Sequence, residues 1–380
     1  MIPTSVLLSP LVAFWASQSA GVGASVPAAA PEAAKPRSAA EIAQAVDAFG
    51  HIDEFAAAAQ KLLDSRPGKD EKAERFLKVA GESCFTDIAL TRWLEWNVAP
   101  GKDASSKDAL LPAVDFSRPG HPFRAITDLN EQLHAHGTDF LVVIFPLRPS
   151  VYPELMVDLP KMDGFAGMVP GTAHFVAELE KAGVDVLFLA EPFVAQRYGK
   201  DGDRNDQLFL KNNQHWTPRA AELAASLVAE RVKSKPWFEQ GKAKEGIDFV
   251  VKPIEKPVTI VWGGAPEWAK PETLKMNSVE SPDPKRRPLT ILPSSPIVLL
   301  ADSFADYHRQ EGADFTTQLW RRLGTSIDLI NPRGGVERAS RDTLRRRPNG
   351  PKDEKIVIWL LPEQVFTCGP QWEPMAMYEK

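Results

Sequence analysis

The sequence predicts an α/β fold, a doubly wound and mostly parallel sheet of about five strands with a short helical N-terminal segment. Three observations favour this fold. Short, unbroken apolar runs, typical of strands buried on both faces, recur along the chain. Stretches with helical spacing alternate with these runs, which favours helices on both faces of one sheet. The 380 residues are 25% charged and 43% hydrophobic, an ordinary globular composition.

The strands are predicted from apolar runs that read, in chain order, DFLVVIFP, VDVLFLAEP, PIVLLADS, SIDLINP and KIVIWLLP. The main helical stretches predicted between and around them are 123–136, 173–183, 218–232, a long one ending at Gly324, and 336–347. In such sheets ligands bind beyond the carboxyl ends of the strands. The residues that directly follow each run are therefore the first candidates for a site.

The N-terminus predicts export. Residues 1–24 hold an apolar segment followed by small residues, which is typical of a secretory signal peptide. No basic residue precedes Lys35, so a disordered apolar tail or a misplaced start codon is the alternative interpretation. Residues 25–40 are rich in Ala, Pro and Ser and predict a linker. We expect the mature protein in the periplasm or outside the cell.

The rest of the chain divides into residues 41–120, a helical segment with a loop, and residues 121–380, which hold the sheet. A Pro-rich insertion at about 235–295 interrupts the second part. Within it, DFVVKPIEKPVTIVWGG predicts a β-hairpin at one edge of the sheet. The two cysteines, Cys84 and Cys368, allow a single pairing, which the sequence does not decide.

Several functional classes are excluded by composition and motifs. The net charge is -5 and no basic patch is interleaved with aromatics, so no nucleic-acid partner is expected. The sequence contains no His-Glu-x-x-His, no phosphate-binding Gly-x-x-x-x-Gly-Lys, no Gly-x-Gly-x-x-Gly and no Cys-x-x-Cys. No metal site is predicted.

A candidate nucleophile lies in IVLLADSFAD, where Ser303 follows a predicted strand and precedes a predicted helix. The amides of a helix's first turn can receive an oxyanion close to such a hydroxyl. The alternative is that Ser303 or Asp302 only caps the helix.

A candidate base lies in NNQHWTPRAA. Thr217 suits the cap and Pro218 the first position of the next helix, and together they fix the backbone directly after His215. Asn213, two residues earlier, carries a carbonyl that can accept from an imidazole. Trp216 is predicted to pack beneath the histidine, with a sugar platform as the alternative.

Four motifs in one order carry a family resemblance: LVVIFPLRPSVYPE, NQHWTPRAA, LLADSFAD and VIWLLPEQVF. Over roughly residues 121–367 the chain resembles the SGNH-hydrolase-like domain of the alginate O-acetyltransferase family, exported bacterial proteins that handle acetyl groups in exopolysaccharide modification. The histidine block precedes the serine block here, the reverse of ordinary SGNH hydrolases, as in this family. Triads are defined by geometry rather than chain order, so the reversal is no obstacle.

The resemblance implies roles for individual residues. Ser303 would be the nucleophile that accepts the acetyl group, His215 its general base, and Asn213 the occupant of the family's aspartate position. The Ser303 N–H would hold the oxyanion, with Gly334 or Gly335 as a further donor; for the glycines a plain strand-to-helix turn is the alternative.

Two further residues, Arg148 and Tyr152, follow a strand and are expected to line the cleft, with loop packing as the alternative.

The function that the resemblance implies is acetylation of a polysaccharide. A membrane-bound acyltransferase would supply the acetyl group, ultimately from acetyl-CoA, and no cofactor would stay bound. The alternatives are an acetyl-esterase and a non-catalytic polysaccharide-binding scaffold.

The chain departs from the family pattern in three places. Ala301 replaces a glycine, Gln364 stands where Arg is common, and Asn213 replaces a carboxylate. The last matters most, because an Asp-to-Asn change in a serine-protease triad costs about 10⁴ in rate. Asp203 or Asp206 could take the place of the missing carboxylate.

Overall fold

Five parallel strands form the central sheet of the computed structural model, in the order β4-β3-β9-β7-β8. Their bounds are β3 Asp139–Phe145, β4 Asp185–Phe188, β7 Ile297–Leu300, β8 Asp328–Ile330 and β9 Ile356–Pro362. Each predicted apolar run contains one of these strands, so the predicted fold class is confirmed. The last strand of the chain, β9, lies between β3 and β7 and is buried along its whole length, which explains its unbroken apolar run.

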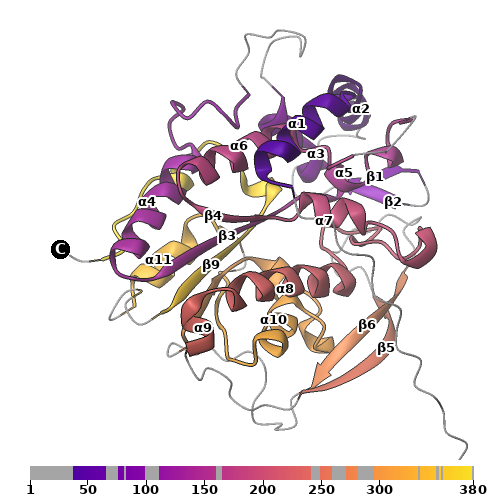
Figure 1. Ribbon diagram of the computed structural model, residues 1–380. Coiled ribbons are helices and arrows are strands. Elements are labelled where there is room, and N and C mark those ends of the chain that lie inside the picture. Colours follow the sequence, from indigo (N-terminus) through magenta and orange to yellow (C-terminus); the bar gives the residue numbers. More distant parts are fainter. Residues whose placement is uncertain are drawn as a thin grey trace, which may run out of the picture. The chain divides into compact units, whose positions relative to one another are not determined.

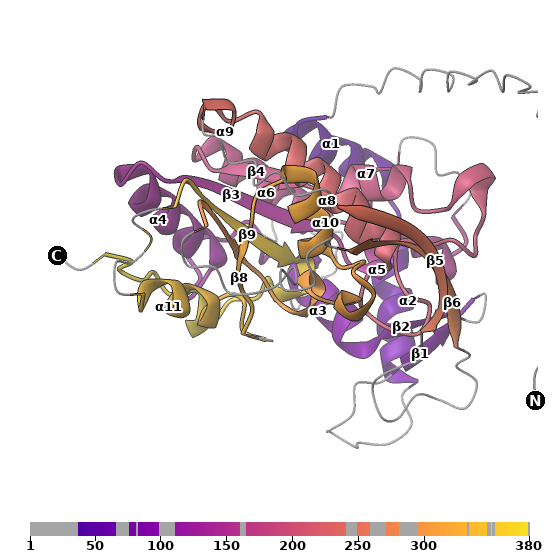
Figure 2. The ribbon, with the colours of Figure 1, turned by 90° about the horizontal axis from the view of Figure 1, so that it is seen from below.

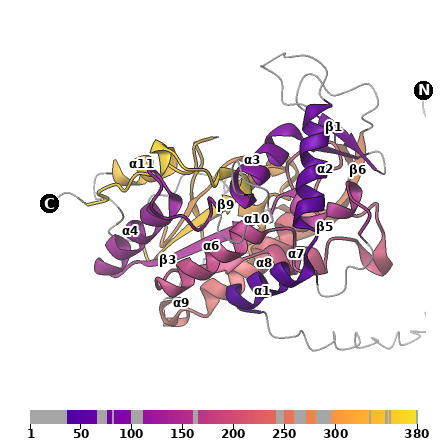
Figure 3. The ribbon, with the colours of Figure 1, turned by 90° about the horizontal axis from the view of Figure 1, so that it is seen from above.

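Helices cover both faces of this sheet (Figure 1). One face packs against α1 Ala39–Phe49, α4 Pro122–Ala135, α6 Pro170–Lys181 and α11 Ala339–Arg345. The other packs against α8 Pro218–Lys233 and α10 Phe315–Leu323. The view from above has α1, α4 and α6 toward the reader (Figure 3), and the view from below has α8 and α10 (Figure 2). Alternate residues of β3 enter the two cores because successive strand side chains point to opposite faces.

The structure describes residues 37–65, 76–80, 83–98, 111–159, 165–240, 249–258, 271–280, 295–332, 334–347, 351 and 354–378, all within the unit Arg37–Lys380. The predicted signal peptide and most of the predicted linker lie outside them. None of the described helices is long and apolar enough to cross a bilayer. Cys84 is buried, Cys368 is exposed, and the two form no disulfide.

The N-terminal segment shares the core of the sheet. It contains α1, α2 Ile52–Asp64 and α3 Asp87–Asn97, as its helical spacing predicts, but also a hairpin of β1 Phe76–Val79 and β2 Ser83–Thr86 that the spacing did not show. Phe55 of α2 and Trp93 of α3 are fully buried in the same cluster as residues of β3. The remaining short helices are α5 Arg148–Val151, α7 Ala190–Ala195 and α9 Pro236–Gln240.

A buried carboxylate, Glu363, ties several of these elements together at the carboxyl end of β9. It accepts hydrogen bonds from the Leu147 amide, at 3.1 Å, and the Ser150 hydroxyl, at 2.7 Å, which start α5. It also accepts from Thr172 of α6, at 2.8 Å, and Asn97 of α3, at 3.3 Å. The Pro-Glu pair of the VIWLLPEQVF motif therefore has a structural role. Its glutamate holds neighbouring elements together at the carboxyl edge of the sheet, where ligands are expected.

The insertion forms a two-stranded antiparallel ribbon, β5 Val250–Val258 paired with β6 Glu272–Glu280 (Figure 2). The expectation that 248–264 folds back on itself is wrong, because β5 takes most of that stretch and its partner lies further along the chain. The ribbon is also a separate sheet rather than an edge of the main one. Pro253 and Pro257 suit β5, an exposed strand whose outer side has no partner strand among the described residues.

The segment after β7 also differs from its prediction. A long helix up to Gly324 was expected, but Ser303 begins a 3₁₀ turn that ends at Ala305, and a second such turn covers Arg309–Glu311. The α-helix begins only at Phe315, capped by the Asp314 side chain. Residues 303–312 are therefore a compact loop over the end of β7.

Candidate active site

The side chains of Ser303 and His215 meet at the carboxyl edge of the sheet. Ser303 Oγ lies 2.8 Å from Nε2 of His215. The capping role is filled by Asp302, whose Oδ1 accepts from the Phe304 amide at 3.0 Å, so the Ser303 hydroxyl is left to the imidazole. Ser303 is partly exposed while His215 is 1% exposed, so the base is shielded from solvent.

A narrow hairpin presents the histidine. The Leu210 amide donates to the His215 carbonyl at 3.1 Å, and the Thr217 amide donates to the Leu208 carbonyl at 2.8 Å. Thr217 also caps α8, as the Thr-Pro pair predicted. Trp216 is fully buried and packs against aromatic rings of the core, so it is not a sugar platform. The backbone on both sides of the imidazole is thus fixed.

Asn213 determines the tautomer of His215. Its Oδ1 accepts from the His215 backbone N–H at 3.1 Å and lies 2.8 Å from Nδ1 of the same residue. A backbone N–H can only donate, so the atom facing it must be the amide oxygen rather than the NH₂. The same oxygen then accepts the Nδ1 proton, and Nε2 is left as the acceptor for the Ser303 hydroxyl.

The imidazole is held neutral by its surroundings. Burial, with a smaller contribution from the nearby His308, lowers the pKa of His215 to about 3. No carboxylate of the described residues acts to raise it. The base is therefore unprotonated at ordinary pH, but the imidazolium that forms when it takes a proton has no anionic partner.

Neither of the two proposed substitute carboxylates contacts the histidine. Asp206 pairs with Arg219 at 2.9 Å, and Asp203 accepts from the Asn205 amide at 2.9 Å. Asn213 is the side chain that receives the imidazole N–H.

Arg148, expected to line the cleft, instead lies inside the protein. It is 3% exposed and donates to the carbonyls of Cys84 and, at 2.7 Å, Lys211, and to Oε1 of Gln207 at 3.1 Å. All of these partners belong to the hairpin that carries His215 or to β2 beside it. The substrate-binding prediction is wrong for this residue, because a buried cation must use its donors on internal acceptors.

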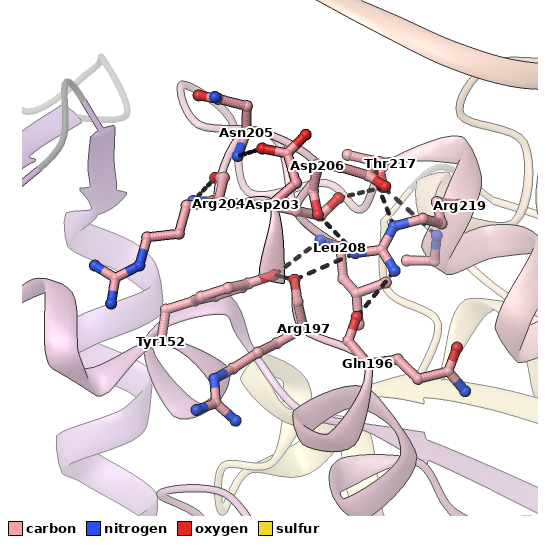
Figure 4. A network of polar contacts seen from close by, with 12 residues as sticks. Tyr152, Gln196, Arg197, Asp203, Arg204, Asn205, Asp206, Leu208, Thr217 and Arg219 are labelled. Carbon is pink, nitrogen blue, oxygen red and sulfur yellow. Dashed lines mark hydrogen bonds and ion pairs between the residues drawn. The ribbon is translucent and has the colours of Figure 1, made fainter. Parts of the chain in front are cut away.

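Tyr152 is likewise fully buried, so its predicted cleft position is wrong. Figure 4 shows its hydroxyl between Arg197 and Leu208; it donates to the Arg197 carbonyl at 2.5 Å and accepts from the Leu208 amide at 2.8 Å. Arg219 adds hydrogen bonds to the carbonyls of Gln196, at 2.9 Å, and Arg197, at 3.3 Å (Figure 4). These contacts hold the base of the histidine hairpin, so loop packing is the correct interpretation for Tyr152.

The insertion ribbon supports the tip of the same hairpin. Oε1 of Glu272, at the start of β6, accepts the amides of Lys211 at 2.6 Å and Asn212 at 3.1 Å. Sequence reasoning missed this residue, since nothing in the Pro-rich insertion indicates which acid reaches the hairpin. The catalytic candidates are thus supported by two segments outside the sheet, β1–β2 and β5–β6.

The Ser303 amide is the remaining feature of chemical interest. Its N–H has no acceptor within the described part of the chain. Gly334 and Gly335, predicted as further donors, are exposed and have positive φ angles of 125° and 67°. The Gly335 carbonyl accepts from the Ala339 amide at 2.7 Å, so the pair forms the turn before α11; its part in an oxyanion site stays a prediction.

Tyr307 completes the site and was not found from the sequence. Its ring stacks on the His215 imidazole, with ring centroids 4.1 Å apart and planes 7° from parallel. Its hydroxyl accepts from Nδ2 of Asn213 at 3.2 Å. A tyrosine four residues after a serine carries no sequence signal of its own, because the contact depends on the loop conformation.

Known proteins resemble this chain in sequence and fold. Over 130 residues, 34% of this chain, it is 28% identical to a Pseudomonas syringae pv. tomato protein named "Probable alginate O-acetylase AlgJ". Over 134 residues, 35% of this chain, it is 26% identical to "Alginate biosynthesis protein AlgX" of Pseudomonas aeruginosa. The matches span only 30% and 27% of those two proteins.

The solved structure of Pseudomonas aeruginosa AlgX superposes with a TM-score of 0.54 and 18% identity, covering 84% of this chain and 68% of that one. At this identity the likeness concerns the fold. The model of the family described as "SGNH hydrolase-like domain, acetyltransferase AlgX" matches residues 105–363, more than half of the 380 residues. The chain therefore belongs to the AlgX family of SGNH-hydrolase-like acetyltransferase domains.

Proposed function

We propose that this protein transfers acetyl groups to hydroxyls of an alginate-type exopolysaccharide, with Ser303 as nucleophile and His215 as general base. The observation that carries the proposal is the 2.8 Å contact between Ser303 Oγ and His215 Nε2, in the tautomer that accepts the hydroxyl proton. The names of the related proteins, an alginate O-acetylase and an alginate biosynthesis protein, support the choice of polymer.

The reaction has two balanced steps. In the first, Ser303 Oγ attacks the carbonyl carbon of an acetyl donor while its proton moves to His215 Nε2. The oxyanion that forms accepts from the Ser303 amide, and the donor's leaving group departs with the proton from His215, leaving acetyl-Ser303. In the second, a sugar hydroxyl gives its proton to His215 and attacks the acetyl carbon. Ser303 recovers the proton, and the acetylated sugar leaves.

The neutral partner makes this a slow catalyst. Asn213 holds the correct tautomer but does not stabilise the imidazolium present in both steps. In a protease triad the equivalent change costs about 10⁴ in rate.

The donor and the location complete the proposal. No group is kept on the protein as a cofactor; a membrane-bound acyltransferase supplies acetyl groups that come ultimately from acetyl-CoA. A periplasmic or secreted protein fits such a donor, and the predicted signal peptide in residues 1–24 supports this location.

The test is acetyl transfer by the purified protein from a chromogenic acetyl ester to alginate oligosaccharides. We expect release of the chromophore together with ester groups on the sugar, and loss of both in Ser303→Ala and His215→Ala. Chromophore release without sugar acetylation, unchanged by the oligosaccharide, would favour the esterase instead.

A polysaccharide-binding scaffold remains the second candidate, because Asn213 weakens the triad. It predicts binding of the oligosaccharide that Ser303→Ala leaves unchanged and no acetyl turnover above the Ser303→Ala background. Calorimetric titration with the oligosaccharide, run beside the ester assay, separates it from the transferase.

A further inference from the structure

The imidazole of His215 lies against two aromatic rings of the Ser303 loop. Tyr307 covers one face in parallel, at 4.1 Å and 7°, and Phe304 lies at 4.7 Å with a tilt of 38°. The loop places Tyr307 firmly, because its amide donates to the Ser303 carbonyl at 3.0 Å. The nucleophile and the ring over the base therefore belong to one hydrogen-bonded loop.

The charge that appears on His215 during catalysis is otherwise uncompensated. Asn213 is neutral, and His308, the titratable group among the described residues that acts on His215, is a buried imidazole whose own pKa is lowered to about 4, so it supplies no negative charge. An aromatic face is negative, and it attracts a cation whose centre lies within about 6 Å of the ring centroid. The parallel contact of Tyr307 meets this condition, and burial strengthens the attraction.

We propose that Tyr307 is a positioning residue whose ring stabilises the imidazolium that His215 forms, and so replaces part of the charge that Asn213 does not supply. This inference rests on the proposed function of the Ser303–His215 pair. The protein would then use a stacked ring where other triads use a carboxylate.

The expected size of the effect is modest. A desolvated cation–π contact changes an equilibrium or a rate by about ten- to thirty-fold. The missing carboxylate is worth about 10⁴ in a protease triad, so the ring offsets only part of that loss.

The hydroxyl of Tyr307 is a separate feature, which Tyr307→Phe removes while it keeps the ring. The Asn213 amide stays oriented in this variant because the His215 backbone N–H still requires its oxygen. We expect acyl transfer to fall less than about five-fold, since one neutral hydrogen bond is lost.

The ring itself is tested by placing progressively fluorinated phenylalanines at position 307. Fluorine withdraws electron density from the ring face with little change in size, so packing is nearly constant along the series. Phenylalanine is the starting point because fluorinated tyrosines would also ionise more easily. Acyl transfer from a chromogenic ester is measured in the native chain, and the pKa of His215 is measured by histidine side-chain NMR in the Asn213→Asp background, where a carboxylate raises it.

We expect the acyl-transfer rate to fall about tenfold along the series and the pKa of His215 to fall in step by about one unit. A pKa of His215 that stays constant along the series overturns the proposal, whatever the rates do. Because the NMR titration needs no turnover, it tests the ring contact even in a protein without acyl transfer. Absence of turnover would instead count against the proposed function.

Discussion

Replacing Asn213 with Asp restores the missing charge with almost no change of shape. The Asn213 Oδ1 position already accepts from the His215 amide and faces Nδ1, and an Asp oxygen can take both contacts. The second oxygen would face the Tyr307 hydroxyl, which now accepts from Nδ2 at 3.2 Å and can rotate to donate. The imidazolium would then have a carboxylate 2.8 Å from its Nδ1.

The magnitude follows from these contacts and from burial. The reverse change in a protease triad costs about 10⁴, or about 5.5 kcal/mol. Position 213 is 5% exposed, so the new carboxylate also loses hydration, which reduces the gain. We expect acyl transfer to rise about ten- to hundred-fold, which corresponds to about 1.4 to 2.7 kcal/mol.

The assay is burst and steady-state release from a chromogenic acetyl ester, with folding checked by circular dichroism. Asn212→Asp is the matched control: it adds the same charge one residue away, and the hydrogen bonds of the His215 imidazole go to Asn213 and Ser303. Ser303→Ala in the Asn213→Asp background should remove the gain. An unchanged rate in folded Asn213→Asp, or an equal gain in Asn212→Asp, would refute the assignment of Asn213 as the third member of the triad.

Three further predictions concern pH and stability. Because burial lowers the pKa of His215 to about 3, the kcat/KM profile should be level from about pH 5 to 8, and Asn213→Asp should move its acid limb toward neutrality. Burial raises the pKa of Asp302 to about 7, so the folded protein binds a proton that the unfolded chain releases. Urea unfolding should therefore show up to about 4 kcal/mol of stability lost as the pH rises from about 4 through 7, and Asp302→Asn should flatten this slope. Arg148→Met should lower the unfolding free energy by about 2–4 kcal/mol, because buried oxygens lose their donor, while KM for the ester stays unchanged in steady-state assays.

The strands could be read from the sequence because a strand buried on both faces needs an unbroken apolar run, and β9 shows it over its whole length. The position of β9 between β3 and β7 could not be predicted from the sequence, since strand order depends on pairing between segments far apart in the chain. The ribbon shows the same limit. Its β5 lies within the stretch predicted as a hairpin, but its partner strand is separated from it by residues 259–271 and carries no matching signal in the sequence.

The residues of the candidate site also fall into those that local sequence predicts and those that depend on distant segments. Ser303, His215 and Asn213 stand in short motifs next to element ends, where local sequence fixes the backbone. The internal partners that bury Arg148 lie on segments distant in sequence, so a polar residue after a strand appeared exposed when it was not. Tyr307 was missed because its contact requires the loop of 3₁₀ turns, where the sequence favoured a helix.

The central claim is that Ser303 carries the acetyl group, and mass spectrometry of the protein after exposure to an acetyl donor tests it most directly. The account predicts one added acetyl group, located by peptide fragmentation on Ser303, formed faster in Asn213→Asp and absent from Ser303→Ala and His215→Ala. An acetyl group that still forms in Ser303→Ala, or a native protein that shows none on Ser303 while it acetylates sugar, would contradict the account.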